Sequence, residues 1–271
     1  MRAAIRRVWG MLFRHVALYR RSWPRLVELA YWPTLQMVIW GLTARFFAAR
    51  LGTGGPSAAL LTASSVLIGG VLLWEIALRS QMGVAISFLE EIWSRNLAHV
   101  FVSPLRPWEL VAALFAISML RTLAGVVPAA ILAWVLYAFN VFAMGPILVL
   151  FAANLLVMGW AVSLAVVSLI LRHGAGAEAL AWSVLFGLAP FSCVFYPVAT
   201  LPAVLRPLAL ALPATHVFEG MRAALEHGVI AWGHLGWAVG LNLAWIVAAG
   251  LIFAWQFRAA RVRGALLAIG E

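Results

Sequence analysis

Long runs of apolar residues, separated by short polar or Gly- and Pro-containing segments, make up most of the chain. A helix of about 20 mostly apolar residues crosses the roughly 30 Å hydrocarbon core of a bilayer. Six stretches are long enough: 28–47, 59–79, 110–139, 147–171, 177–196 and 236–257, the second of which continues as helix to residue 88. The pattern predicts an all-α integral membrane protein with six transmembrane helices.

The composition supports the same class. Of 271 residues, 65% are hydrophobic and 10% are charged, with a mean hydropathy of +1.00. Soluble domains have about 45–50% apolar and about 25% charged residues, so a water-soluble fold is excluded. The net charge is +10, and in so apolar a chain we expect anionic lipid headgroups, not nucleic acid, as its partner. The single cysteine, Cys193, excludes an internal disulfide.

The first 25 residues mix arginines with apolar side chains at helical spacing. This pattern predicts an amphipathic helix in the membrane interface, although a disordered basic tail stays possible. A cleavable signal peptide would place a short apolar core directly after its positive charges, and that core is absent. We therefore divide the chain into an interfacial segment, 1–25, and a six-span membrane domain, 26–271.

Arginine counts predict the orientation, because loops on the cytoplasmic side carry the excess of positive charge. Thirteen arginines fall on the side of the N-terminus and four fall on the opposite side. Both termini are therefore expected in the cytoplasm. The thirteen are Arg2, Arg6, Arg7, Arg14, Arg20, Arg21, Arg25, Arg95, Arg106, Arg172, Arg258, Arg261 and Arg263, and the four are Arg45, Arg50, Arg206 and Arg222.

The connection after the second span is too long for a simple turn. Its apolar residues recur at helical spacing over about 88–103, and Pro104 ends the pattern. Glu91 and Arg95 are spaced to form an i,i+4 pair. We expect a short cytoplasmic helix that a groove of another protein could hold, or one that only rests on the lipid headgroups. Its candidate contact residues are Glu90, Glu91, Trp93, Arg95, Asn96 and His99.

The segment before the last span, about 197–228, contains too many prolines for one helix. Irregular backbone at membrane depth must be covered by protein or water, so we expect re-entrant half-helices near the outer surface. Thr215 is a candidate N-cap for a last short helix, in which Glu219 and Arg222 are spaced to pair. The candidate outer-gate residues are Phe195, Tyr196, Pro197, Pro202, Pro213, Glu219 and Arg222.

Three charged residues lie within predicted spans. Charge near the centre of a bilayer costs at least about 2.5–3.5 kcal/mol, so these side chains should face protein or water. Counting residues along the helices places Glu75 and Arg121 at similar depths. We expect these two to pair, with Arg79 extending toward the cytoplasmic surface; the pair could hold two helices together or guide a substrate.

Sites of chemistry are not indicated. The six histidines are scattered, so neither a metal site nor a Ser-His-carboxylate triad is expected. No G-x-x-x-x-G-K-[ST] phosphate-binding loop occurs. A membrane-embedded lipid-modifying enzyme and an ATP-independent carrier or channel remain as alternatives to a transporter subunit that does no chemistry itself.

Taken together, six spans, the N-terminal amphipathic helix and a cytoplasmic helix with a glutamate pair resemble the type-2 permeases of ATP-binding cassette (ABC) exporters. The segment from Phe195-Tyr196-Pro197 through Leu212-Pro213 to Arg222 resembles the C-terminal element of that family. In such a permease, residues 4–21 would form the elbow helix and Glu90 to Val100 the coupling helix.

The resemblance also implies partners and a location. Two permeases would pair, most simply as a homodimer, with pairing to a close relative as the alternative. A separate ATPase subunit would bind ATP and Mg, so no cofactor is expected on this chain. The location would be the bacterial inner membrane, and the cargo would move outward. The substrate stays open among a lipid, a lipid-linked glycan and a hydrophobic drug.

Overall fold

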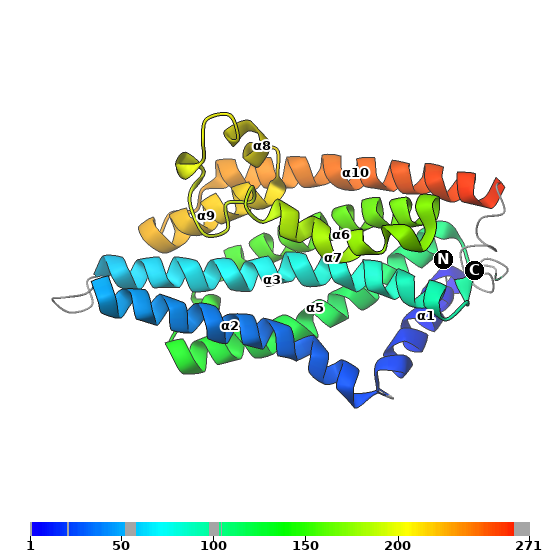
Figure 1. The fold of residues 1–271 in the computed structure, drawn as a ribbon, viewed down its shortest axis with the longest axis horizontal. Coiled ribbons are helices and arrows are strands. Elements are labelled where there is room, and N and C mark those ends of the chain that lie inside the picture. Colours follow the sequence, from blue (N-terminus) through cyan, green and yellow to red (C-terminus); the bar gives the residue numbers. More distant parts are fainter. Residues whose placement is uncertain (1, 21, 52–57, 98–102, 104, 263–271) are drawn as a thin grey trace.

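The computed structural model describes all residues except 1, 21, 52–57, 98–102, 104 and 263–271. Helices, and no strands, are found within the described residues. Most of the long ones run side by side along the longest axis of the molecule (Figure 1). The elements are α1 (Arg2–Arg20), α2 (Trp23–Leu51), α3 (Ala58–Trp93), α5 (Pro107–Tyr137), η1 (Val141–Met144), α6 (Pro146–His173), η2 (Gly174–Ala177), α7 (Ala179–Leu188), η3 (Val198–Thr200), α8 (Arg206–Leu210), α9 (Pro213–His227) and α10 (Trp232–Val262).

Four helices of the described chain are long and apolar enough to cross a membrane, and the chain is a multi-pass membrane protein. They are Ala63–Trp93, Pro107–Tyr137, Pro146–His173 and Trp232–Val262, and they match the second, third, fourth and sixth predicted spans. Each has 28 to 31 residues and is therefore about 42–46 Å long. The first predicted span corresponds to α2, which packs against α3 and α5 but is not among these four.

The fifth predicted span is wrong as a continuous helix over 177–196. Helix α7 has ten residues, which is about 15 Å and too short to cross. Turns follow it, and Cys193 has a positive φ of 54°. Proline provides a physical reason, because Pro190 has no N–H for the helical ladder and its ring would clash with the carbonyl one turn earlier.

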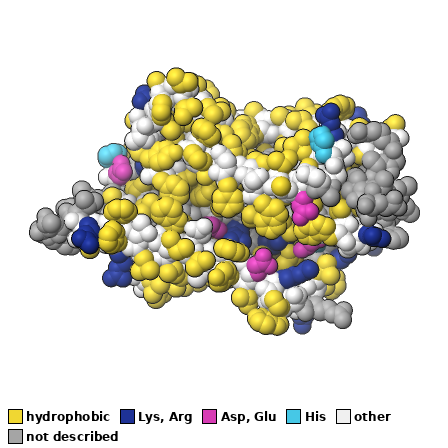
Figure 2. All heavy atoms as spheres, in the orientation of Figure 1, with side chains coloured by type: hydrophobic (Ala, Val, Ile, Leu, Met, Phe, Trp, Pro, Cys, Tyr) yellow, Lys and Arg dark blue, Asp and Glu magenta, His cyan; other side chains and the backbone are white. Residues whose placement is uncertain are grey.

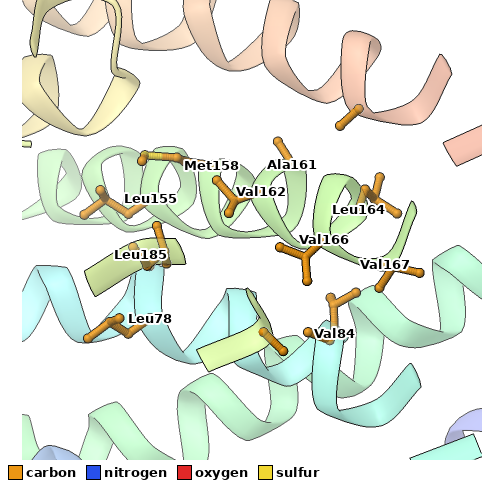
Figure 3. Close-up of a cluster of buried hydrophobic side chains, with 14 of the residues drawn as sticks. Leu78, Val84, Leu155, Met158, Ala161, Val162, Leu164, Val166, Val167 and Leu185 are labelled. Carbon is orange, nitrogen blue, oxygen red and sulfur yellow. The ribbon is translucent and has the colours of Figure 1, made fainter. Parts of the chain in front are cut away.

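Helix α6 forms the centre of the bundle and packs mainly against α3 and α10. Leu155 and Val166 of α6 are buried among side chains of α3 and α7, including Leu78, Val84 and Leu185 (Figure 3). Such packing, not the hydrophobic effect, holds membrane helices together, because lipid tails are as apolar as leucine. The central bundle is therefore a fixed framework that positions the ends of α3.

Helix α1 lies at one end of the bundle and at an angle to α2 (Figure 1). The ends of α3 at Trp93, of α6 at His173 and of α10 at Val262 are at this same end. The exposed fraction is 61% for Trp9 and 69% for Phe13, whereas His15 and Tyr19 are buried. The amphipathic N-terminal helix is therefore present, with one face on the bundle and one aromatic face outside it.

Candidate functional site

The C-terminal end of α3 holds the glutamate pair that the sequence placed on a separate cytoplasmic helix. Glu90 and Glu91 belong to the last turn of α3, which ends at Trp93. A turn follows in which Arg95 has a φ of 52°, and Leu97 is helical again. A single helix over 88–103 is therefore wrong, because the backbone reverses at Arg95. His99 lies outside the described residues.

Glu91 is buried, with 1% of the residue exposed. Both of its oxygens accept from Nη1 of Arg14 at 2.6 Å, and Oε2 also accepts from Nδ2 of Asn96 at 2.7 Å. The expected pairing of Glu91 with Arg95 is replaced by these bonds. Charge-assisted bonds to a buried carboxylate are among the stronger polar contacts in proteins, so Glu91 links α1 to the end of α3.

Glu90 extends the same contact toward the membrane. Its Oε1 accepts from the Tyr19 hydroxyl at 3.1 Å and lies 3.7 Å from Nη1 of Arg25. His15, fully buried, has its ring nitrogens 3.8 Å from Glu90 and 3.5 Å from Glu91. Burial is the main cause that raises the pKa of Tyr19 above its usual value, so Tyr19 stays protonated and donates.

A second contact fastens the start of α1 to α5. Arg7 donates from Nε to Oε2 of Glu109 at 2.8 Å and from Nη2 to Oε1. Glu109 also accepts from the backbone N–H of Arg106 at 2.9 Å and so caps α5. The bond to Glu109 raises the pKa of Arg7. We call these contacts of α1 with Glu90, Glu91 and Glu109 the elbow clasp.

Trp93, Ser94 and Arg95 are exposed next to the elbow clasp. Trp93 is 51% exposed, and its Nε1 donates to Oε2 of Glu178 at 3.4 Å. Glu178 directly precedes α7. The last turn of α3 therefore contacts α1 through Glu91 and the residue before α7 through Trp93.

A cavity of about 560 Å³ extends from the elbow clasp toward the middle of the bundle. We call it the inner groove. Its α3 wall is a single helical stripe: Glu75, Leu78, Arg79, Met82, Gly83, Ile86, Glu90 and Trp93. Helices α1, α2, α5 and α7 supply the remaining walls. Acidic and basic side chains gather within the otherwise hydrophobic face of the molecule between α2 and α3 (Figure 2).

The intramembrane charges meet in this groove, but they pair differently from the prediction. Oε2 of Glu75 lies 3.2 Å from Nε of Arg79, one turn along α3. Arg121 instead donates to the hydroxyl of Ser87 at 3.0 Å, and its guanidinium lies 4.9 Å from the centre of the Tyr19 ring. The predicted Glu75–Arg121 pair is wrong, because an i,i+4 partner on the same helix is closer.

At the opposite end of the bundle, α9 anchors the chain that follows α7. Glu219 and Arg222 form the predicted i,i+3 pair at 3.0 Å. Nη1 of Arg222 donates to the carbonyl of Cys193 at 2.9 Å, and Oε1 of Glu219 accepts from the N–H of Val198 at 2.7 Å. The pair therefore satisfies backbone groups of the turn segment that no helix satisfies.

The other predicted gate residues lie around this anchor. Phe195 stacks on Trp40 of α2 with ring centres 4.7 Å apart, and Tyr196 donates to the carbonyl of Pro190. Pro197 and Pro202 are exposed and Pro213 is buried. The predicted N-cap at Thr215 is wrong: α9 begins at Pro213, and the Thr215 hydroxyl donates to the carbonyl of Phe191.

Comparison with family models decides the classification. The ABC-2 type transporter model matches residues 7–225, from the first turns of α1 into α9. The chain belongs to the ABC-2 type transporter family. No curated protein matches it. As a member of this family, the chain is the membrane component of a transporter. The elbow clasp, the inner groove and the Glu219–Arg222 anchor all lie within the matched residues.

One polar contact of this permease is not predictable from helical spacing, because its members are 18 residues apart. His216 of α9 and His234 of α10 have their Nδ1 atoms 3.3 Å apart, and Nε2 of His216 lies 2.9 Å from the carbonyl of Leu210. Only the fold brings the two rings together. No group of three His, Cys, Asp or Glu within the described residues is arranged to hold a metal ion.

The histidine contact predicts a pH dependence of stability for the permease. Burial is the main cause that lowers the pKa of His216 below 6.5, so the fold favours the neutral ring. The unfolded chain then binds more protons, and stability should be lost as pH falls below about 6.5. Thermal unfolding of detergent-purified protein between pH 5 and pH 8 should show this loss, and His216→Gln should reduce it.

The matched control is His227→Gln, since His227 is exposed at the end of the same helix. Its unfolding temperature should depend on pH as in the unaltered chain. Equal pH dependence in His216→Gln and the unaltered chain would contradict the assignment.

Proposed function

We propose that the chain is the permease subunit of an ATP-driven exporter, in which a separate ATPase subunit binds ATP and Mg. The observation that carries this is the family match from α1 into α9. In the proposal two copies form a homodimer in a bacterial inner membrane. Helix α2 and a broken passage, made of α7 and the turns that follow it, complete six membrane passages. An amphipathic substrate moves outward between them.

Both termini are proposed to face the cytoplasm. The end of the bundle that holds α1, Trp93, His173 and Val262 also holds most of the arginines of the described chain. Positive charge marks the cytoplasmic side. Arg206 and Arg222 of the opposite end would then face outward, where the Glu219–Arg222 anchor would hold the turn segment as an outer gate.

We propose that the ATPase contacts the segment 93–103 and not Glu90 or Glu91 directly. Glu91 is buried against Arg14, whereas Trp93 and Arg95 are exposed. In this arrangement the glutamates transmit movement of the docking segment to α1. His99 belongs to the proposed docking segment by its position in the sequence.

Replacing Trp93 should separate ATP hydrolysis from transport. Trp93→Ala removes an exposed aromatic side chain and its bond to Glu178, and large aromatic residues often dominate binding surfaces. Proteoliposomes containing the permease and the ATPase encoded in the same genome should lose about tenfold or more of their ATP-driven transport. The measurement is transport and ATP hydrolysis in the same vesicles.

Trp232→Ala is the matched control, because Trp232 is 65% exposed at the opposite end of the molecule. It should keep normal coupling. Transport that continues without ATP would favour an ATP-independent carrier, and conversion of a lipid without its movement would favour a membrane-embedded enzyme. Either result would overturn the proposed function.

A further inference from the structure

Two charged residues of the inner groove, Glu28 on α2 and Arg121 on α5, form no ion pair within the described residues, and Glu28 is exposed. Glu75 pairs with Arg79, and Glu90 contacts Arg25, Tyr19 and His15. Within the described residues, Arg121 forms no ion pair with a carboxylate. It donates to the neutral hydroxyl of Ser87 and lies over the Tyr19 ring. Glu90 is near enough for the charge of Arg121 to act on its carboxylate. Its Oε1 contacts Tyr19 and Arg25, whereas its Oε2 accepts no hydrogen bond from the described residues and lies 3.8 Å from His15.

The position of Arg121 makes this lack of a partner significant. It is 14 residues after Pro107, about 21 Å along a helix of 31 residues, and so near the middle of the span. Charged residues at such depth usually pair with one another or mark the path of a ligand. An arginine retains several unused N–H donors after one hydrogen bond, and its planar group suits phosphate and carboxylate.

The groove also provides an apolar surface beside Arg121. Trp32 of α2 and Trp182 and Phe186 of α7 line it, and each is 43–55% exposed. Its volume of about 560 Å³ falls in the range of sites for drug-sized ligands. A cation next to aromatic walls that open to the surface fits a molecule with an anionic head and an apolar body.

We propose that the inner groove binds amphipathic molecules with an anionic head, a phosphate or carboxylate that pairs with Arg121. This inference rests on the proposed transport function and names the substrate class of the same chain. The apolar body lies against Trp32, Trp182 and Phe186. Arg79, on the α3 wall of the groove, is a second positive charge.

The test uses amphiphiles that share a twelve-carbon tail and differ in the head: dodecyl phosphate, dodecylphosphocholine and dodecyltrimethylammonium. Binding is titrated to the full chain in nanodiscs of uncharged-head lipid, with empty nanodiscs subtracted. Dodecyl phosphate should bind about tenfold or more tightly than dodecyltrimethylammonium. Inorganic phosphate alone should bind much more weakly, and equal binding would overturn the requirement for an apolar body.

Substitutions of Arg121 distinguish binding of the anionic head from a purely structural role of this residue. Arg121→Gln should weaken dodecyl phosphate about tenfold or more and leave dodecyltrimethylammonium unchanged or tighter. Arg121→Lys keeps the charge and should restore part of the affinity. Arg172→Gln, at an exposed site at the end of α6 outside the groove, should change neither.

If Arg121→Gln does not fold, Trp182→Ala provides a second test, since it should weaken dodecyl phosphate and leave inorganic phosphate unchanged. Three results would overturn the inference: unchanged binding of dodecyl phosphate in both variants, tighter binding of dodecyltrimethylammonium than of dodecyl phosphate to the unaltered chain, or no binding because a second copy fills the groove. ATP-driven transport by the permease–ATPase complex is measured in parallel. Absence of ATP-driven transport in the unaltered complex would count against the proposed function, whereas intact transport with unchanged dodecyl phosphate binding in the variants would count against the groove alone.

Discussion

Gly159→Ala is expected to destabilise the protein by about 3 kcal/mol, at the upper end of the usual cost of overpacking a core. A Cβ atom at Gly159 of α6 would lie 2.7 Å from the carbonyl oxygen of Ala77 and 3.0 Å from the backbone nitrogen of Gln81, and it would also clash with the Ser80 hydroxyl. Two of these atoms belong to the backbone of α3, so the helix itself would have to move. The measurement is the unfolding temperature and the monodisperse yield in detergent.

Gly250→Ala is the matched control for this prediction. Gly250 also lies within a membrane-spanning helix, α10, and no heavy atom lies within 4 Å of a Cβ built there. Alanine favours helix over glycine by about 0.5–1 kcal/mol, so this variant should be as stable as the unaltered chain or slightly more. If the two variants unfold at the same temperature, the close approach of α6 to α3 is not a determinant of stability.

Glu91→Ala is expected to release α1 from the end of α3. The change removes the acceptor of Arg14 and Asn96 and takes one of two nearby carboxylates from buried His15. Bonds to charged groups contribute about 1.5–3 kcal/mol, and because the Arg14 side chain is 36% exposed we expect about 2 kcal/mol. The unfolding temperature should fall by about 5 °C or more.

Under the proposed function, the same variant should also lower ATP-driven transport while the ATPase stays bound, because the docking segment would no longer move α1. Arg14→Ala should have a similar effect, and the double variant should cost little more than either single one. Glu226→Ala serves as control, because Glu226 is exposed and its contact with exposed His227 is long, at 4.0 Å. Fully additive losses for Glu91→Ala and Arg14→Ala would show that the two residues do not act through one contact.

The sequence was sufficient to predict an all-α membrane protein, because a membrane-spanning helix is recognised by the length and low polarity of an apolar run. The apolar runs beginning near residues 59, 110, 147 and 236 lie within α3, α5, α6 and α10. A helix satisfies its own backbone hydrogen bonds, so each such run can be identified without knowledge of its neighbours. The Glu219–Arg222 pair was predictable for the same reason, since both residues lie on one turn of α9.

Contacts between distant segments could not be read in this way. Helical spacing placed Glu91 opposite Arg95, whereas the turn at Arg95 and the position of α1 direct Glu91 to Arg14, 77 residues away. Similar depth along the two helices predicted that Glu75 pairs with Arg121. Depth does not determine how each helix is rotated about its axis, and this rotation decides which side chains face each other. Because of the rotation of α3, Ser87 accepts a hydrogen bond from Arg121, and Glu75 forms its ion pair with Arg79.

Periodicity and composition thus specify which segments are helical and which solvent surrounds them, because both depend on local hydrogen bonding and on transfer from water. The elbow clasp, the inner groove and the His216–His234 contact depend on how helices approach and rotate against one another. Glycine-sized gaps such as the one at Gly159 set those approaches, and their effect appears only when two helices are in contact.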